Sequence, residues 1–278
     1  MSFVVAYPGT IGSFSYSAAK SVFPDAELVG YAAFEDAAQA VTEWKADYAV
    51  LPIENSFAGA VLKTYALLEK LPIHIVGETY RTVRHQLLGV PGATLSDIRT
   101  ITSHPQAIAQ CDRFLEKLQN IQIIPSLNTA LSAREVSEKK DPSIAAIASL
   151  ESQQEYGLSV IAENIQSSDH NTTRFFIVSM DSQPLGTPDK ATVVFRVLNE
   201  VGALVRVLAS FSKSGLNMTR IESRPIPDEP FQYFFTADFE GTMERTHLRM
   251  AMEKAKPVTQ ELRLLGTYPR YSDDAGQL

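Results

Sequence analysis

Cysteine and positive charge are both scarce in this chain of 278 residues. The single cysteine, Cys111, excludes an intrachain disulfide bond and a metal site built from several cysteines, and it fits a reducing compartment. A formal net charge of -7 argues against a general nucleic-acid-binding protein, because such a protein needs a basic surface to neutralise phosphates. No stretch approaches the roughly 20 apolar residues that a membrane helix requires. We therefore expect a cytoplasmic protein that binds neither nucleic acid nor a membrane.

The apolar residues that are present make up 45% of the chain, which is enough for an ordinary core. From residue 1 to about residue 180, short β-branched runs alternate with segments of helical periodicity, which predicts an α/β architecture with mostly parallel sheet. Periodicity leaves open whether these strands form one sheet or two lobes. In either case, a ligand site should lie in a crevice beyond the carboxyl ends of strands. The predicted strands span residues 3–7, 27–31, 48–52, 73–76, 100–103, 122–125, 143–148 and 174–179.

A segment rich in proline, glycine and polar residues, DSQPLGTPDK at residues 181–190, is typical of a linker between domains. It divides the chain into a first domain of residues 1–180 and a second domain of residues 191–270. In the second domain, strand and helix patterns follow in the order βαββαβ, which predicts a ferredoxin-like unit. The last residues, 271–278, are expected to form a frayed tail.

Polar side chains follow an apolar strand directly in the stretch YAVLPIENSFAGAV, residues 48–61. Glu54, Asn55 and Ser56 can present a carboxylate, an amide and a hydroxyl to a ligand in the crevice. The alternative is that Asn55 and Ser56 cap the next helix, because both residue types are common N-caps. The residues alone leave both interpretations open.

Two more junctions between a strand and a helix carry groups that suit a small polar ligand. In ITSHPQAIAQC, Ser103 or His104 can cap a helix that Pro105 begins, and free backbone N–H groups there can bind an anion. In AYPGTIGSFS, two glycines precede Ser13, but the endings of a P-loop and of a dinucleotide fingerprint are missing. We interpret this second turn as a close approach of the backbone to a small ligand.

Threonines and an arginine stand where an apolar strand begins in SSDHNTTRFFIVS, residues 167–179. The simple explanation is that threonine favours strands and that an arginine at a strand end is usually solvated. The alternative is a site at this end of the strand. The junctions together offer hydroxyls, amides and one arginine, without a metal cluster or a cofactor motif. Such a set suits a small anionic substrate whose reaction needs orientation and a proton donor.

The chain contains six motifs in the order PIENS (52–56), SHPQA (103–107), YGL (156–158), NTTRF (171–175), GALV (202–205) and ESRP (222–225). In kind, order and spacing they resemble the motifs of prephenate dehydratases with a C-terminal ACT regulatory domain, and the resemblance covers nearly the whole chain. It implies a two-lobed catalytic domain similar to periplasmic binding proteins, with the active site between the lobes, followed by a ferredoxin-like ACT domain. It also implies conversion of prephenate to phenylpyruvate, with loss of water and carbon dioxide and without a cofactor.

The resemblance also implies roles for individual residues. By position, Thr173 is the residue most closely tied to catalysis, and we expect it to donate a hydrogen bond or a proton to the departing hydroxyl. Arg174 is expected to fix a substrate carboxylate. Glu54 is a second candidate proton carrier if burial raises its pKa. The pocket would be lined by Asn55, Ser56, Ser103, Gln106 and Thr172, with Gly12 and Ser13 contributed by the first loop.

For the second domain, the resemblance implies that L-phenylalanine binds between the ACT domains of two subunits and inhibits the enzyme. A homodimer or a homotetramer is therefore expected. Gly202 and Ala203 lie at a predicted helix start, where backbone N–H groups can meet a carboxylate. The alternative is a plain dimerisation module. The implied effector site consists of Gly202, Ala203, Leu204, Asn217, Glu222, Ser223, Arg224 and Pro225.

Two rival functions remain at this stage. Arogenate dehydratase performs the same elimination on a substrate that carries an amino group in place of the keto group. A sensor without catalytic activity would join a module resembling binding proteins to an amino-acid-binding module. The NTTRF and PIENS stretches favour an enzyme, because a sensor needs no hydroxyl aimed at a leaving group.

Overall fold

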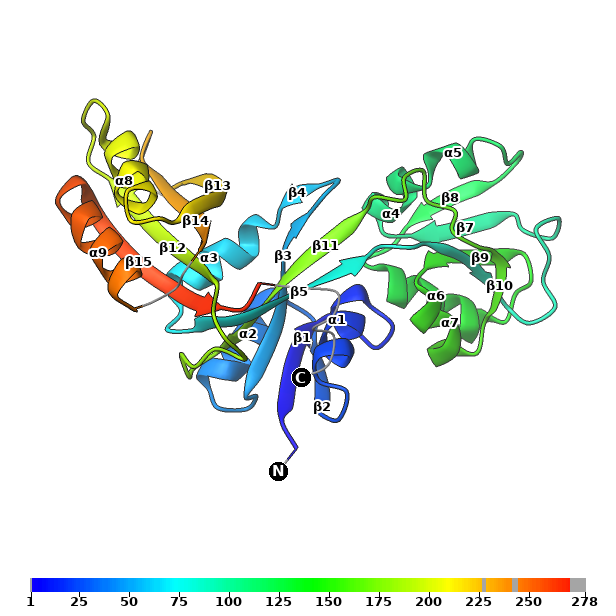
Figure 1. Ribbon diagram of the computed structural model, residues 1–278. Coiled ribbons are helices and arrows are strands. Elements are labelled where there is room, and N and C mark those ends of the chain that lie inside the picture. Colours follow the sequence, from blue (N-terminus) through cyan, green and yellow to red (C-terminus); the bar gives the residue numbers. More distant parts are fainter. Residues whose placement is uncertain (1, 227–228, 242–244, 271–278) are drawn as a thin grey trace.

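The computed structural model describes residues 2–226, 229–241 and 245–270, and the predicted tail of residues 271–278 lies outside them. The described chain forms three sheets with helices packed on them, so the expected α/β class is confirmed (Figure 1). The first sheet, which is the first lobe, has the order β2 (Glu27–Tyr31), β1 (Val4–Pro8), β3 (Tyr48–Asn55), β11 (Thr172–Ser179) and β5 (His74–Thr82), with β4 (Gly59–Ala60) beside β3.

The second lobe has its own sheet and lies beyond the ends of β5 and β11 (Figure 1). Its strands have the order β10 (Ser159–Ala162), β6 (Gln86–Gly89), β9 (Ile144–Ala148), β7 (Thr100–Ser103) and β8 (Gln122–Pro125). The two lobes carry the helices α1 (Phe14–Val22), α2 (Phe34–Thr42), α3 (Leu62–Lys70), α4 (Pro105–Gln110), α5 (Asp112–Leu115), α6 (Thr129–Lys139) and α7 (Leu150–Tyr156).

The expectation of mostly parallel sheet is wrong, because both lobes contain mixed sheets. In the first sheet, β1 pairs in parallel with β2 and β3, whereas β11 is antiparallel to both β3 and β5. The chain leaves the first lobe along β5 and returns along β11, so these two strands must run in opposite directions. Sequence periodicity reports which residues are buried but not the direction of the neighbouring strand.

The C-terminal sheet has the predicted element order βαββαβ. Its strands lie in the order β13 (Asn217–Pro225), β14 (Tyr233–Glu240), β12 (Lys190–Val197) and β15 (Thr259–Tyr268). The helices α8 (Ala203–Ser212) and α9 (Arg245–Ala255) cover this sheet, and the short 3-10 helix η1 (Lys256–Val258) follows α9. Stacking of the Phe211 and Phe239 rings, with centroids 4.1 Å apart, marks the core between helix and sheet.

The C-terminal sheet is docked firmly on the first lobe. Val194, Leu265 and Tyr268 belong to the same buried cluster as residues of β3 and β11. Gly266 lies so close to β5 that an added Cβ atom would stand 1.9 Å from the carbonyl oxygen of Ile75. A shared core and a close backbone contact leave little room for the C-terminal sheet to slide on the first lobe.

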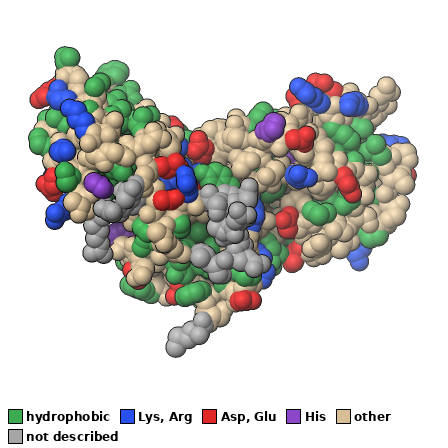
Figure 2. Space-filling view, viewed as in Figure 1, with side chains coloured by type: hydrophobic (Ala, Val, Ile, Leu, Met, Phe, Trp, Pro, Cys, Tyr) green, Lys and Arg blue, Asp and Glu red, His purple; other side chains and the backbone are tan. Residues whose placement is uncertain are grey.

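The surface carries no concentration of basic charge on the face shown in Figure 2, where Lys and Arg side chains are interspersed with Asp and Glu. Within the described ranges, none of the helices has the length and apolar character needed to cross a membrane.

Candidate active site

The site that the motifs point to lies where β3 ends and β11 begins, at the crossover between the lobes (Figure 1). In the strand register, Thr173 stands opposite Asn55 on β3 and opposite Arg81 on β5. Directly opposed residues of antiparallel strands point to the same face of a sheet, so these three side chains share one face. The neighbouring pair, Arg174 and Glu54, points to the other face.

Asn55 is the centre of a hydrogen-bond cluster on the first of these faces. Its Nδ2 donates to Thr173 Oγ1 at 2.9 Å and to Asn171 Oδ1 at 2.8 Å. Its Oδ1 accepts from the backbone N–H groups of Phe57 at 3.0 Å and Ala58 at 2.9 Å, which fixes the turn after β3. Asn55 therefore caps a turn and not the next helix, and its amide also reaches the threonine.

This geometry leaves the hydroxyl proton of Thr173 available. Because the oxygen of Thr173 accepts a hydrogen bond from Asn55, its own O–H can point to another acceptor. Thr173 is half-buried, which places the hydroxyl between protein and a potential ligand. The arrangement is suited to a donor aimed at a leaving group.

Asn171 is a site residue that the sequence analysis did not single out, although it opens the NTTRF motif. It is only 2% exposed, and its Nδ2 has no hydrogen-bond partner in the described chain. A buried amide N–H without a partner costs about 1–3 kcal/mol, so an acceptor supplied by a ligand or a water molecule would be favourable there. The signal in the sequence was an asparagine directly before the strand, next to the two threonines.

Ser56 and Thr172 join the two strand ends. The hydroxyl of Ser56 donates to the carbonyl of His170 at 2.8 Å and accepts from the backbone N–H of Thr172 at 2.9 Å. The structure thus brings both residues beside Asn55 and Thr173. The Ser56 hydroxyl is occupied in holding the strands together, so contact of Ser56 or Thr172 with a substrate stays a prediction.

An open cleft of about 570 Å³ lies between α1 of the first lobe and α7 of the second. Arg81, the cross-strand neighbour of Thr173, lines it, and Nε of Arg81 is buried without a hydrogen-bond partner among the described residues. Thr173 and Asn55 do not line this cleft themselves. Arg81 therefore connects the hydrogen-bond cluster to the cleft and brings a positive charge to it.

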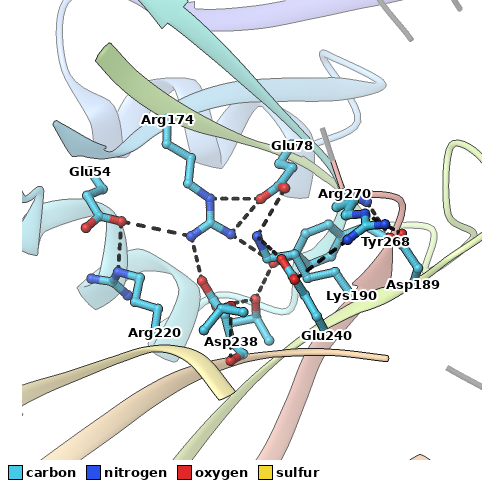
Figure 3. A network of polar contacts seen from close by, with 12 residues as sticks. Glu54, Glu78, Arg174, Asp189, Lys190, Arg220, Asp238, Glu240, Tyr268 and Arg270 are labelled. Atoms are coloured by element: carbon cyan, nitrogen blue, oxygen red, sulfur yellow. Dashed lines mark hydrogen bonds and ion pairs between the residues drawn. The ribbon is translucent and has the colours of Figure 1, made fainter. Parts of the chain in front are cut away.

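The expectation that Arg174 fixes a substrate carboxylate is wrong for this structure, because protein groups surround its guanidinium (Figure 3). Arg174 Nη1 lies 2.5 Å from Asp238 Oδ2, and Nη2 lies 2.6 Å from Glu78 Oε2. Arg174 is 5% exposed. Burial opposes its charge, but neighbouring charges, led by that of Asp238, raise the pKa of Arg174 above its ordinary value. The positive charge of Arg174 therefore pairs with one carboxylate of the first lobe and one of the C-terminal sheet.

Glu54 is likewise misplaced for the role of proton carrier. It lies on the Arg174 face, and its Oε2 accepts from Nε of Arg220 in β13 at 2.9 Å (Figure 3). The carboxylate is 38% exposed and paired with an arginine, so it is not the buried, isolated group that the expectation required. Strand alternation explains the error, because adjacent residues of β3 point to opposite faces.

The first loop joins the two lobes. The carbonyl of Gly12 accepts hydrogen bonds from the hydroxyls of Ser149 at 2.7 Å and Ser152 at 3.0 Å. Gly12 has φ +85°, and an added Cβ would stand 2.6 Å from Ser152 Oγ, so this position requires glycine. Ser13 caps α1 by accepting from the N–H of Tyr16. These contacts position the loop at the lobe junction, and a direct substrate contact of Gly12 or Ser13 stays a prediction.

The SHPQA junction lies on the second lobe. His104 caps α4 as expected, by accepting from the N–H of Gln106. The fully buried Ser103 donates to the carbonyl of Ile147 at 2.6 Å. The nearby side chains of His85 and Gln110 contact each other at 2.8 Å, and burial lowers the pKa of His85. Contact of Ser103 or Gln106 with a substrate therefore stays a prediction.

A second cleft, of about 310 Å³, lies at the start of α8. Gly202, with φ +75°, is the N-cap of α8, and Ala203 is its first residue. Both line the cleft together with Leu204, and Tyr233 and Phe235 of β14 form another part of its wall. Helix N–H groups and aromatic side chains are suited to an amino acid with an apolar side chain.

The other implied effector residues lie on β13, at the edge of the C-terminal sheet. Pro225 stands opposite Tyr233, near the second cleft, whereas Asn217 stands opposite Glu240 at the other end of β13. These ends are about 26 Å apart by strand geometry. One chain cannot bring Asn217 and Gly202 to the same small ligand. Within this stretch, Arg224 pairs with Glu69 of α3, Glu222 pairs with Arg220, and Ser223 is exposed.

Comparisons with known proteins point to one family. The model of the prephenate dehydratase family matches residues 5–183. Arogenate dehydratase/prephenate dehydratase 1 of Arabidopsis thaliana, a chloroplastic protein, is 38% identical over 281 residues, which cover 95% of this chain and 71% of that protein. Among the described residues, no group of three or more His, Cys, Asp or Glu side chains is placed to hold a metal ion.

Several solved structures resemble nearly the whole chain. A prephenate dehydratase from Arthrobacter aurescens in complex with L-Phe is 32% identical with a TM-score of 0.86, and the match covers 96% of this chain and 90% of that one. GqqA, described as a novel type of quorum quenching acylase, is 33% identical with a TM-score of 0.87, and the match covers 96% and 98% of the two chains.

Proposed function

Because the chain belongs to the prephenate dehydratase family, we propose that it converts prephenate to phenylpyruvate, with loss of water and carbon dioxide, in the biosynthesis of L-phenylalanine. Such an enzyme is a carbon–oxygen lyase. The observation that carries the proposal is the hydrogen bond from Asn55 to Thr173 at the lobe junction. It holds a hydroxyl in one orientation with its proton free.

The substrate already contains the chemical driving force. As the ring becomes aromatic, the bond to the ring carboxylate breaks, carbon dioxide leaves, and the electron pair enters the ring. The C–O bond of the ring hydroxyl breaks at the opposite position, and hydroxide takes a proton and leaves as water. Thr173 donates the hydrogen bond or proton to this departing group. A free threonine hydroxyl is a very weak acid, so orientation by Asn55 and exclusion of water must supply much of the effect.

The substrate carries two carboxylates, and the Thr173 face offers groups that bind anions. Arg81 takes over the role that was expected of Arg174, because it lies beside Thr173 and its buried Nε has no hydrogen-bond partner among the described residues. Asn171 supplies an N–H donor in the same cluster. The hydroxyl of Ser103 and the amide of Gln106 complete the pocket from the second lobe if the lobes close on the substrate.

Arogenate is the second candidate substrate. Relatives that are 37% and 38% identical to this chain are named arogenate dehydratase or arogenate dehydratase/prephenate dehydratase. The two substrates differ only in a side-chain amino group, which replaces a keto group. Glu151 and Glu163 line the cleft between α1 and α7, and their carboxylates are groups of the kind that recognises an ammonium.

For regulation, we propose that residues 1–180 form the catalytic domain, that residues 181–190 connect it, and that residues 191–270 form an ACT domain that binds L-phenylalanine. The cleft at Gly202, Ala203 and Leu204 accepts the amino acid, and β13 of a second copy completes the site with Asn217. The solved structure of a relative in complex with L-Phe supports phenylalanine as the ligand. The proposal makes the functional unit a homodimer or a homotetramer.

The experiment that tests the function measures product formation from prephenate and from arogenate, each with and without L-phenylalanine. We expect phenylpyruvate from prephenate, with less product when phenylalanine is present. Product from arogenate alone would transfer the substrate assignment to arogenate. If the folded protein turns over neither compound, the enzyme proposal is wrong and the sensor interpretation is favoured.

A further inference from the structure

One side chain links the catalytic strand to the C-terminal sheet. Arg174 follows Thr173 on β11, but its guanidinium leaves the first lobe and contacts Asp238 of β14 and Tyr268 of β15 (Figure 3). Its Nε donates to Glu78 of β5 at 2.8 Å. Three elements thus hold one guanidinium, and any shift of β14 acts directly on the residue next to Thr173.

The partners of Arg174 are themselves fixed. Thr192 Oγ1 donates to Asp238 Oδ1 at 2.7 Å and lies 2.6 Å from the hydroxyl of Tyr268. Lys190 Nζ lies 3.2 Å from Glu78 Oε1 (Figure 3). Asp238 and Thr192 are fully buried. A buried charge that loses its partner is costly, so the groups of this network must move together or not at all.

The strand that carries Asp238 also lines the second cleft. Tyr233 and Phe235 of β14 form part of the cleft at the start of α8, and Asp238 lies further along the same strand. β14 is hydrogen-bonded on both sides, to β13 and β12, so it is an inner strand of the C-terminal sheet. Asp238 and the cleft residues Tyr233 and Phe235 therefore belong to one strand that is held along both edges.

We propose that Arg174 is a positioning residue for Thr173, held from the C-terminal sheet by Asp238, and that β14 transmits ligand binding at the second cleft to the catalytic hydroxyl through this pair. The proposal rests on the proposed function for the identity of the ligand and the reaction. It assigns the transmission from the second cleft to Thr173 to the Arg174–Asp238 contact and not to the whole interface between the C-terminal sheet and the first lobe.

The same interface offers a matched control. Arg224 of β13 pairs with Glu69 of α3, which also joins the C-terminal sheet to the first lobe. This pair does not touch β11, and Glu69 is nearly as buried as Arg174, with an 8% exposed side chain. Removing the charge of Glu69 therefore perturbs the interface between the C-terminal sheet and the first lobe, but it leaves the Arg174–Asp238 pair beside Thr173 in place.

The test compares full-length Asp238→Asn and Glu69→Gln with the wild-type chain. Calorimetry gives the Kd of L-phenylalanine, turnover gives kcat and KM with and without saturating phenylalanine, and hydrogen exchange follows the amides of residues 172–176. An allosteric effect of typical size is about 5- to 150-fold. In Asp238→Asn, we expect the Kd to stay within about threefold while the effect on turnover falls below about twofold. Glu69→Gln should keep the effect of saturating phenylalanine on turnover.

Tyr268→Phe is a milder variant, in case Asp238→Asn does not fold. It removes the hydroxyl that contacts Arg174 and Thr192 without leaving a buried charge unpaired, so we expect partial loss of the phenylalanine effect with unchanged binding. The proposal is overturned if both network variants respond to phenylalanine as the wild type does, or if Glu69→Gln loses the response equally.

Hydrogen exchange separates this proposal from the proposed function. If phenylalanine alters exchange at residues 172–176 in the wild type and not in Asp238→Asn, the coupling stands even when neither prephenate nor arogenate is turned over. If phenylalanine leaves these amides unchanged in the wild type, the coupling is wrong whatever the reaction.

Discussion

The two faces of strand β11 at the lobe junction differ in how completely their polar groups are paired. On one face, the Thr173 hydroxyl proton, the Nδ2 group of Asn171 and the Nε group of Arg81 have hydrogen-bonding capacity to spare. On the other face, Arg174 is enclosed by Glu78, Asp238 and Tyr268.

This difference suits one face of β11 to ligand binding and the other face to anchoring of the strand. Groups with spare capacity can exchange a missing partner for a ligand, which favours recognition of a polar substrate. Fully paired buried charges gain nothing from a ligand and fix the position of the backbone. Under the proposed function, a single strand thus presents one face, the reactive face, to the substrate and the other, the anchored face, to the C-terminal sheet. Mutations on the two faces should differ in kind, with losses of rate on the first and losses of stability or regulation on the second.

The largest effect is expected from Thr173→Ala. We expect kcat to fall roughly 10²- to 10⁴-fold, the range for loss of a positioned proton donor. Stability should change little, because the half-buried hydroxyl has one protein partner. Steady-state turnover of prephenate, with unfolding followed in urea, gives both quantities. Thr173→Ser, which keeps a hydroxyl, serves as the control, and a loss below tenfold in a folded Thr173→Ala would remove Thr173 from this role.

On the anchored face, Arg174→Met should act on stability first. It removes the cation of the buried Asp238 and leaves Glu78 paired with Lys190, and breaking such a buried pair costs about 3–5 kcal/mol. Urea unfolding measures the change in the free energy of unfolding. Arg134→Met, at an exposed pair with Glu138, is the control and should cost about 0.5 kcal/mol or less. A cost below about 1 kcal/mol at Arg174 would contradict its anchoring role.

Asn171→Ala tests whether the unpaired amide on the reactive face contributes to substrate binding. It removes the acceptor for Asn55 and the free N–H donor, so we expect kcat/KM to fall about 5- to 150-fold, equivalent to about 1–3 kcal/mol. Kinetics with prephenate provide the measurement. Asn128→Ala is a matched asparagine at the N-cap of α6, and it should lower stability while leaving kcat/KM within about twofold. Equal kinetic effects of the two variants would count against Asn171 as a substrate contact.

The smallest effect is expected from Glu54→Gln, next to Asn55 but on the anchored face. Its pair with Arg220 is partly exposed, so its loss should cost about 1 kcal/mol or less and change kcat less than about threefold. The measurement is turnover across pH, beside Asn55→Ala as the comparison on the reactive face. A tenfold loss of kcat with wild-type stability would restore Glu54 as a proton carrier.

Motifs in the sequence identified the right segments but not the orientation of each side chain. NTTRF and PIENS correctly marked adjacent strand ends, and Thr173 and Asn55 do contact each other. Arg174 and Glu54 were assigned to the same site because Arg174 follows Thr173 in the chain and Glu54 precedes Asn55. Which residue of a strand faces the substrate depends on the register with β3 and β5, and that register joins segments more than 90 residues apart. Arg81 and Asn171 emerged only from this register and from the pattern of unpaired atoms.

By itself, the sequence determined the α/β class, the βαββαβ order of the C-terminal sheet and the segments that form the site, because periodicity, turn residues and short motifs are local properties. Only the tertiary structure decided the mixed strand directions, the face on which each polar side chain lies and the docking of the C-terminal sheet on the first lobe. These features depend on contacts between distant segments. There, a buried charged side chain forms an ion pair with an oppositely charged side chain that the fold brings close to it. For Arg174, that charge is Asp238, which lies on a different sheet.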